Sequence, residues 1–346
     1  AESLHMSALV EVHSPADIEK IRPIYPALVG INCRNLEDFR IDRLLPVSRR
    51  PFINWEAQVV FESGIFSYED ALYTRMHNFQ GILVGEAVVR RPGLIPDLIH
   101  GVSGTGTRNG SMPPRPWLFW QYVADLVEAR GLASDNRSAI RRRPLVKICG
   151  IACAEDGMLA ARLGADLLGF VFAESPRRAS ADLVRSLTGL KVLKVAVVVG
   201  TVPPEVRSLM EEGLLDAIQF SGDEIPEACF DQAWPYYKAI RPRSADDLVK
   251  LDDWRCPRLL LDAWSAQAYG GTGKRLDPAL VEAAAGKLSL WLAGGIGPDN
   301  VAELIRDHGP ELVDLSSSLE KRPGEKDPEL MARFFAAIES SCPQKS

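Results

Sequence analysis

The stretch PLVKICGIACAEDGMLAARLGAD, residues 144–166, joins a short apolar run directly to a helical pattern. The apolar run, residues 146–151, is rich in β-branched residues and is interrupted by a lysine and a cysteine. From residue 154 the apolar positions recur every three or four residues, which predicts an amphipathic helix. A buried strand followed at once by a helix is the repeating unit of parallel α/β proteins.

The same alternation continues along the rest of the chain. Helical patterns, such as those at residues 203–213 and 298–309, separate eight short apolar runs. The runs are residues 146–151, 166–172, 191–199, 215–220, 236–242, 258–264, 290–296 and 312–318. Eight strand–helix units predict a complete TIM-type (β/α)8 barrel, which we assign to residues 144–346.

The first hundred residues repeat the pattern only four times. Their apolar runs are residues 8–13, 27–34, 58–64 and 81–88, and a helical pattern at residues 94–102 follows them. Four units predict a half-barrel over residues 1–103. Because a four-stranded parallel sheet has two open edges, we expect something to cover them.

A linker over residues 104–143 separates the two series. It begins with a stretch rich in Gly, Ser and Pro, contains an aromatic amphipathic helix at residues 117–131, and ends in an arginine-rich segment. We interpret the arginines as a solvated linker rather than a binding patch. We expect the helix to pack on the half-barrel, or two half-barrels to pair between chains as a homodimer.

Composition limits the classes of partner. The chain has 346 residues, 46% of them hydrophobic, which favours two domains, and its net charge of −6 without a basic stripe argues against nucleic acid. The six cysteines show no metal-ligand spacing, and no apolar stretch is long enough for a membrane span, so we expect a cytoplasmic protein without a metal. The opening AESLHMS fits either a tag remnant or the cut edge of a longer chain.

Two residues at predicted strand ends are candidates for acid–base chemistry. Cys149 lies at the end of the first strand-like run of the barrel and Asp262 at the end of the sixth. Reacting groups of (β/α)8 barrels lie at the C-terminal ends of the strands. Each residue also has a structural interpretation, since cysteine is often a small buried hydrophobe and aspartate often caps a turn. Together they form a candidate acid and base.

The last two strands predict an anion site. Gly294 and Gly295 follow the seventh run, and Asp314, Ser316 and Ser317 lie in the eighth. Backbone N–H groups in the loops after strands seven and eight are the usual phosphate site of such barrels. For the glycines, a tight turn is the alternative interpretation.

Two further features belong to the same predicted rim. Arg177 follows the second run, where a guanidinium could hold a carboxylate through two N–H bonds or be a surface charge. The loop YGGTGK, residues 269–274, lacks the spacing and position of a P-loop. We interpret it as a lid that excludes water.

Residues 145–340 resemble the phosphoribosylanthranilate isomerases of tryptophan biosynthesis. The motifs that carry the resemblance are VKICGI, ADLLGFVFAESPR, LDAIQFSGDE, LLLDAWSAQAYGGTGKRLD, LAGGIGPDNV and VDLSSSLEKRPGEKDPEL. The resemblance implies a cofactor-free Amadori isomerisation of N-(5-phosphoribosyl)anthranilate to 1-(2-carboxyphenylamino)-1-deoxyribulose 5-phosphate. It implies that Cys149 is the general base, that Asp262 is the general acid, and that Arg177 holds the anthranilate carboxylate.

Two positions depart from the family pattern. Ser221 stands in QFSGDE where the family usually has a histidine, and Ser318 stands where it usually has a glycine. Both changes could lower activity without removing the acid or the base. The alternative hypothesis is therefore a non-catalytic protein that binds a phosphorylated ligand or another partner, although retention of Cys149, Asp262 and Arg177 argues against it.

Residues 7–102 resemble the second half of indole-3-glycerol phosphate synthase, through ALVEVH, VGINCRNL, FESGI and LVGEAVVR. The chain as a whole thus resembles a bifunctional tryptophan-biosynthesis enzyme, or an N-terminally truncated piece of one. The family places its essential lysines on the first half-barrel, so we expect this carboxy-lyase activity only where that half is present. The resemblance implies that Glu11 and Asn32 are catalytic or substrate-binding and that Arg34 contacts the anthranilate part. It also implies that Glu62 and Ser63 lie at the rim near the phosphate loop, with Gly64 and Gly85 in that loop.

Overall fold

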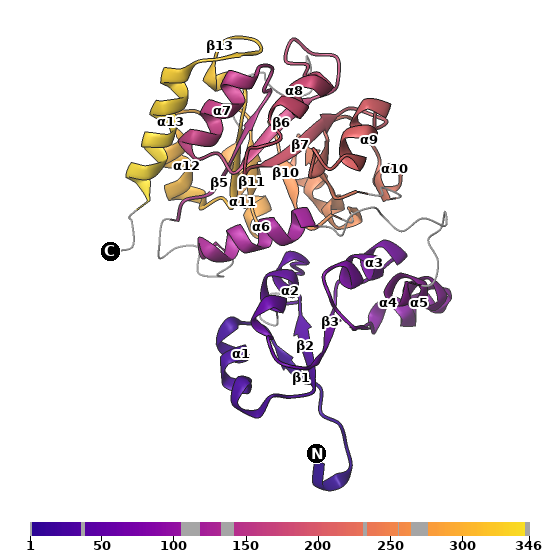
Figure 1. The fold of residues 1–346 in the computed structure, drawn as a ribbon. Coiled ribbons are helices and arrows are strands. Elements are labelled where there is room, and N and C mark those ends of the chain that lie inside the picture. The colour runs from indigo at the N-terminus through magenta and orange to yellow at the C-terminus, as the bar shows by residue number, and fades with distance from the viewer. Residues whose placement is uncertain are drawn as a thin grey trace. The chain divides into compact units, whose positions relative to one another are not determined.

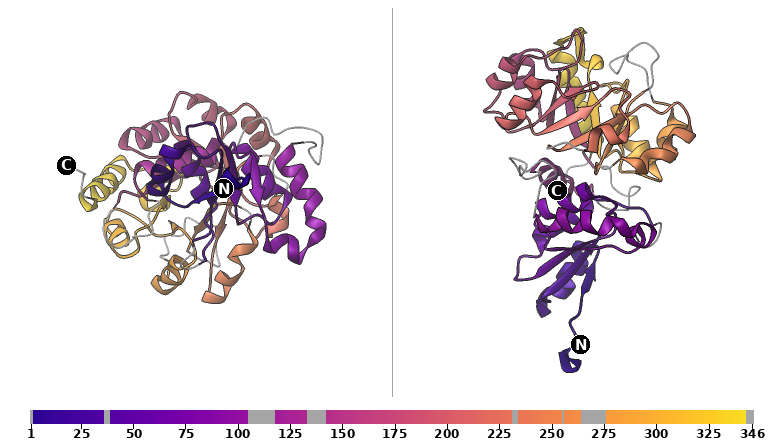
Figure 2. Two further views of the ribbon diagram at one scale, coloured as in Figure 1. Left: turned by 90° about the horizontal axis from the view of Figure 1, so that it is seen from below. Right: turned by 90° about the vertical axis from the view of Figure 1, so that its right-hand side faces the viewer.

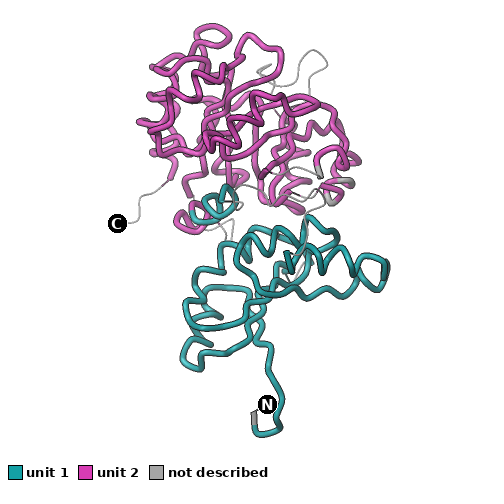
Figure 3. The backbone as a smooth tube through the Cα atoms, turned by 45° about the vertical axis from the view of Figure 1, so that its right-hand side comes forward, with its two compact units in different colours: residues 1–125 teal, residues 126–346 magenta. Residues whose placement is uncertain are grey.

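The computed structural model describes residues 2–35, 39–104, 118–132, 142–230, 234–254, 256–263 and 276–342. It divides into two compact units, residues 1–125 and residues 126–346 (Figure 3). Most of the predicted linker and the predicted lid at residues 269–274 lie outside the described residues.

Unit 2 contains the predicted barrel. Its eight parallel strands close in the order β10-β11-β12-β5-β6-β7-β8-β9, which confirms the (β/α)8 fold. Chain order is kept around the ring, as expected when each strand is followed by a helix that returns along the outside. The strands are β5 (Leu145–Cys149), β6 (Leu167–Val171), β7 (Leu193–Val198), β8 (Ala217–Phe220), β9 (Tyr236–Ile240), β10 (Leu259–Leu261), β11 (Trp291–Ala293) and β12 (Leu312–Leu315).

Helices cover the outside of the strands, as the magenta-to-yellow ribbons of Figures 1 and 2 show. They are α7 (Ala154–Leu163), α8 (Ala181–Ser186), α9 (Pro204–Glu211), α10 (Pro226–Phe230), α11 (Pro278–Ala285), α12 (Val301–His308) and α13 (Pro328–Ser341). One connection differs from a regular unit, because a 3-10 helix, η5 (Ala245–Asp253), follows β9. Four of its nine residues are aspartates, which have low α-helical propensity.

The two ends of the barrel have different chemistry. At the N-terminal ends of the strands, Arg258 donates to Glu311 through Nε at 2.7 Å and Nη2 at 3.0 Å, and Trp291 Nε1 donates to the same carboxylate at 2.8 Å. All three side chains are buried, and Arg258 Nη1 also donates to the carbonyl of Pro257 at 2.9 Å. In this fold, residues at the N-terminal ends of the strands usually stabilise the barrel, and residues at the C-terminal ends usually carry the chemistry.

A small hairpin that the sequence patterns do not indicate follows the last strand. It consists of η6 (Ser317–Leu319), β13 (Glu320–Arg322) and β14 (Glu325–Lys326), which pair antiparallel. Gly324 turns the hairpin with φ of +86°, which glycine adopts without strain. The hairpin matters for the site because it positions Glu320 and Lys326.

Unit 1 contains a four-stranded parallel sheet in the order β1-β2-β3-β4, as predicted for a half-barrel. The strands are β1 (Val10–Val12), β2 (Leu28–Asn32), β3 (Gln58–Glu62) and β4 (Gly81–Leu83). The helices between and after them are α1 (Pro15–Ile21), α2 (Leu44–Arg49), α3 (Tyr68–Met76), α4 (Glu86–Arg90) and α5 (Ile95–Ser103). The described residues of this unit also form four short 3-10 helices, η1 (Glu2–Leu4), η2 (Arg22–Ile24), η3 (Arg50–Phe52) and η4 (Pro92–Leu94).

Helix α6 (Leu118–Ala129) occupies the predicted aromatic segment, and its first residues belong to unit 1 and its last to unit 2. Phe119, Trp120, Val123 and Val127 on this helix are buried, as its amphipathic pattern predicts. Within the described residues, no helix has both the length and the apolar character needed to cross a bilayer.

Candidate active site

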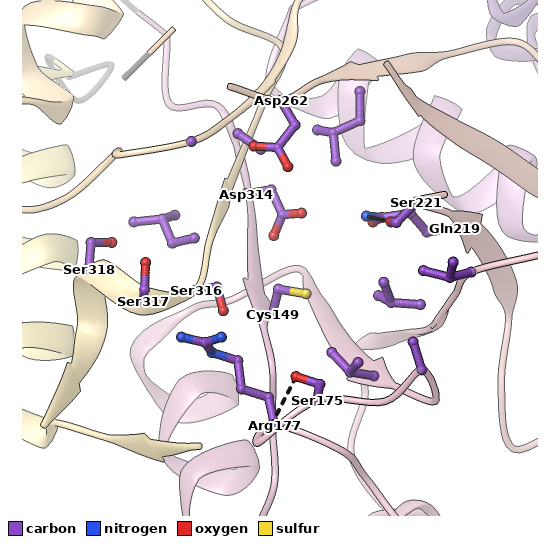
Figure 4. A pocket seen from close by; sticks show the side chains of 18 of the residues that line it. Cys149, Ser175, Arg177, Gln219, Ser221, Asp262, Asp314, Ser316, Ser317 and Ser318 are labelled. Carbon is purple, nitrogen blue, oxygen red and sulfur yellow. Dashed lines mark hydrogen bonds between the residues drawn. The ribbon is translucent and has the colours of Figure 1, made fainter. Parts of the chain in front are cut away.

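A pocket of about 390 Å³ lies at the C-terminal ends of the barrel strands (Figure 4). Its size suits a small-molecule ligand. The structure brings all eight residues that the sequence analysis assigned to the barrel site to the wall of this pocket: Cys149, Arg177, Asp262, Gly294, Gly295, Asp314, Ser316 and Ser317. Their chemical roles remain predictions.

Cys149 is the last residue of β5, and its sulfur points into the pocket (Figure 4). Gly150 follows with φ of +76°, and a Cβ there would lie 2.8 Å from Cδ of Arg177. Burial raises the pKa of the Cys149 thiol, while the nearby Lys147 ammonium acts to lower it. The thiol is thus placed for proton transfer, and burial and the Lys147 charge act on its ionisation in opposite directions.

Asp262 directly follows β10, and its carboxylate faces the same pocket from the other side (Figure 4). Its Oδ1 accepts a hydrogen bond from the N–H of Ala263 at 2.8 Å. Burial and the negative charge of Asp314 raise the pKa of Asp262 to about 6. A carboxyl that keeps its proton to that pH can act as a general acid.

The loop after β11 contains the two glycines of the predicted anion site, here called the glycine cradle. Gly294 and Gly295 have φ of +91° and +62°, so both the tight turn and the open backbone depend on glycine. A Cβ on Gly294 would lie only 2.5 Å from Cβ of Ala263. Asn300 holds the loop, since its Nδ2 donates to the carbonyl of Gly295 and its Oδ1 accepts from the N–H of Gly297, each at 2.8 Å.

Ser318 joins this loop to the one after β12. Its hydroxyl donates a hydrogen bond to the carbonyl of Ile296. Ser316 and Ser317, which also line the pocket, lie at the start of η6, the short helix that follows β12. The family's usual glycine at position 318 is therefore replaced by a residue that ties the two sides of the cradle together.

Arg177 is held in place by a buried carboxylate from the C-terminal hairpin. Its Nε and Nη2 donate to Glu320 at 2.8 Å each, and Lys326 Nζ donates to the same carboxylate at 3.0 Å. Although burial acts to raise the pKa of Glu320, these hydrogen bonds and charges lower it overall. Among the described residues, Nη1 of Arg177 has no acceptor, so this edge of the guanidinium is available to a ligand.

A buried polar layer lies under the pocket, and the sequence analysis missed it. Lys147 Nζ donates to Asp314 Oδ2 at 2.7 Å and to Gln219 Oε1 at 2.8 Å, and Tyr237 Oη donates to Gln219 Oε1 at 2.9 Å. Gln219 Nε2 donates to Ser221 Oγ at 2.9 Å, so the serine at the family's histidine position has a partner. A lysine within an otherwise apolar strand was the signal that could have revealed the layer.

Unit 1 has a pocket of its own, of about 610 Å³. Its wall includes all seven residues assigned to the synthase-like site: Glu11, Asn32, Arg34, Glu62, Ser63, Gly64 and Gly85. Asn32 Nδ2 donates to Glu11 Oε1 at 2.9 Å, and this bond lowers the pKa of Glu11. Burial and the charge of Glu11 raise the pKa of Glu62 to about 7, so the two carboxyls differ in protonation near neutral pH.

Within the part of the chain that the structure describes, no group of three or more His, Cys, Asp or Glu side chains is arranged to hold a metal ion. The described polar groups of the barrel pocket are instead suited to acid–base chemistry and to binding anions.

Comparison with known proteins identifies relatives of both units. The family model for N-(5'phosphoribosyl)anthranilate isomerase matches residues 146–337, and the model for indole-3-glycerol phosphate synthase matches residues 1–95. The N-(5'-phosphoribosyl)anthranilate isomerase of Citrifermentans bemidjiense is 41% identical over 196 residues, covering 55% of this chain and 95% of the relative. That of Rubrobacter xylanophilus is 40% identical over 203 residues, covering 56% of this chain and 98% of the relative.

Solved structures agree with these matches. The phosphoribosyl anthranilate isomerase of Thermotoga maritima has a TM-score of 0.52 at 30% identity and covers 57% of this chain and 99% of its own. The enzyme of Thermus thermophilus has a TM-score of 0.50 at 35% identity and covers 57% of this chain and 98% of its own. Because the isomerase model matches more than half of the sequence, the chain belongs to the phosphoribosylanthranilate isomerase family.

Proposed function

We propose that unit 2 catalyses the Amadori isomerisation of N-(5-phosphoribosyl)anthranilate to 1-(2-carboxyphenylamino)-1-deoxyribulose 5-phosphate, a step of tryptophan biosynthesis. The observation that carries the proposal is the convergence of Cys149 and Asp262 on one pocket that also contains the glycine cradle. A non-catalytic binding protein would need the cradle but not an acid and a base at the same rim.

The proposed reaction uses these two residues in sequence. Asp262 gives its proton to the ring oxygen of the furanose, and the ring opens to a Schiff base. The Cys149 thiolate then removes the proton from C2 of the sugar, which yields an enolamine that becomes the ketone. Arg177 holds the carboxylate of the anthranilate, and the Gly294–Gly295 loop with Ser316 and Ser317 holds the phosphate.

Removal of either proton-transfer group tests the proposal. Cys149→Ala and Asp262→Asn should each lower turnover by at least about a hundredfold, since a positioned acid or base contributes typically 10²–10⁴. The rate is measured from the loss of anthranilate-ribose fluorescence, with Cys153→Ala as the matched cysteine control. Near-normal turnover in one of the site variants would show that its residue has a different role, and an inactive wild-type chain would favour the binding-protein alternative.

The protonation states predict an unusual pH dependence of kcat/KM. The active form needs protonated Asp262 and ionised Cys149, yet the carboxyl has a pKa of about 6 and the thiol titrates above it. Above about pH 6, loss of the carboxyl proton is balanced by gain of thiolate, so kcat/KM should be flat until the thiol itself titrates. Below about pH 6 the carboxyl is already protonated and the thiolate population falls, so the rate should fall about tenfold per pH unit.

The substrate phosphate also titrates near this pH, with a pKa of roughly 6. The dissociation constant of the reaction product, measured over the same pH range, separates phosphate ionisation from that of the enzyme. A value of kcat/KM that keeps rising from about pH 6 to about pH 8 would show that Asp262 does not titrate where the structure indicates.

Arg177 and Glu320 should affect binding more than chemistry. Arg177→Ala removes contacts that exist in both ground and transition states, so KM should rise more than kcat falls. Glu320→Gln should also raise KM more than it lowers kcat, but to a smaller extent, because it weakens the ion pair that fixes the Arg177 guanidinium. Arg178→Ala is the matched control, since Arg178 pairs with Glu205 on the surface. A fall in kcat at constant KM would place Arg177 in the chemistry instead.

For unit 1, the pocket around Glu62 favours a second function, the binding of a phosphorylated ligand such as the isomerase product. The resemblance to the synthase family calls for essential lysines, but Lys20 is the single lysine in residues 1–125. It lies on α1 with its side chain 75% exposed, paired with Asp17. We therefore expect binding without carboxy-lyase turnover in this chain.

Calorimetric titration with the isomerase product checks this expectation. In an Arg177→Ala background, Arg34→Ala should weaken the remaining binding by about tenfold, as expected when one ion-paired contact to a ligand carboxylate is lost. Arg90→Ala, at an exposed arginine paired with Glu86, is the control. Formation of indole-3-glycerol phosphate by the purified chain would contradict the expectation.

A further inference from the structure

Lys147 is a fully buried charge inside the barrel. Its side chain has no solvent exposure, and it lies on β5 two residues before Cys149. Side chains two residues apart on a strand point to the same face, so Lys147 occupies the layer directly below the thiol. An ammonium in this position is costly unless charge or function compensates for its burial.

Strand β6 brings the ammonium and the thiol together. A Cβ on Gly169 would lie 2.8 Å from Sγ of Cys149 and 3.1 Å from Cε of Lys147. Glycine therefore leaves a space on β6 that both side chains enter. Because Nζ is bonded to Cε, the lysine charge lies close to the sulfur, and in an interior of low polarity a nearby full charge changes the ionisation of a thiol strongly.

We propose that Lys147 is a positioning residue whose charge favours the thiolate form of Cys149 and so opposes the effect of burial. Asp314 and Gln219 fix the ammonium from β12 and β8, with acceptor distances of 2.7 Å and 2.8 Å. The inference rests on the proposed function only in taking Cys149 as the base.

The charges around the pair favour an ionised lysine. Although burial acts to lower the pKa of Lys147, the neighbouring negative charges, that of Asp314 the largest, and the hydrogen bond to Asp314 together raise that pKa. The thiol itself is faced by Lys147 and Lys326, which favour the thiolate, and by Asp314, which opposes it, with Lys147 the strongest of the three. Tyr237 and Asp262 are the other titratable groups that interact with this layer.

Alkylation of Cys149 by iodoacetamide tests the proposal without any need for turnover, because only the thiolate reacts. The rate is measured against pH, with the site of reaction assigned by tandem mass spectrometry and Cys153 on the same peptide as internal reference. Lys147→Gln keeps a hydrogen-bond donor and removes the charge. We expect its Cys149 rate at pH 7 to fall at least about tenfold and the midpoint of the curve to move to higher pH.

The matched control is Lys194→Gln, since Lys194 is a buried lysine on β7 that donates to the carbonyl of Leu190 and does not line the pocket. It should leave the Cys149 curve unchanged. Lys147→Arg, which keeps the positive charge, should retain a curve closer to that of the wild type.

Gln219→Glu tests the effect of the Lys147 charge on Cys149 without replacing the lysine. The added negative charge beside Nζ should move the Cys149 midpoint in the same direction as Lys147→Gln. Unchanged Cys149 curves in both Lys147→Gln and Gln219→Glu would overturn the proposal, whatever happens to kcat. A shifted curve in a chain with no isomerase activity would support the role of Lys147 and reject the proposed function.

Discussion

The ion pair between Lys147 and Asp314 joins the first and last strands of the barrel. The two residues are register partners in the pairing of β5 with β12, so the salt bridge crosses the seam at which the ring closes. Their burial makes the alternative, a barrel left open at this seam, expensive, because each charge would lose its partner in an apolar interior. The positions of the rim residues follow from this closure.

On three strands, a residue of the buried polar layer is followed two positions later by a residue at the rim of the pocket. Lys147 and Cys149 are both on β5. Gln219 on β8 is followed by Ser221 directly after that strand, and Asp314 on β12 is followed by Ser316 directly after that strand. Since alternate residues of a barrel strand face inward, each buried polar group lies directly below a residue that lines the pocket. Hydrogen bonds within the lower layer therefore fix the spacing of the upper one.

The sequence was sufficient for the fold and for most of the rim, because both depend on local patterns. The strand–helix alternation predicted the barrel, and the rule that barrel sites lie at strand C-termini selected Cys149, Asp262 and the glycine loop. Glu320 could not be found this way, since its role depends on a hairpin that brings it to Arg177, 143 positions earlier in the chain. The alternation of strands and helices also does not indicate that the segment after β9 is the 3-10 helix η5, which is rich in aspartate, a residue of low α-helical propensity.

The two serines that depart from the family pattern illustrate how the lower layer and the cradle tolerate change. Ser221 accepts a hydrogen bond from Gln219, so loss of an imidazole leaves no buried donor unsatisfied at this point. The Ser318 hydroxyl donates a hydrogen bond to the carbonyl of Ile296, and a glycine at position 318 could not make this side-chain bond between the two loops. In both cases a hydrogen bond accommodates the substitution, to Gln219 of the preceding strand β8 for Ser221 and to the loop after β11 for Ser318. The charges that act on Cys149 and Asp262 are unaffected.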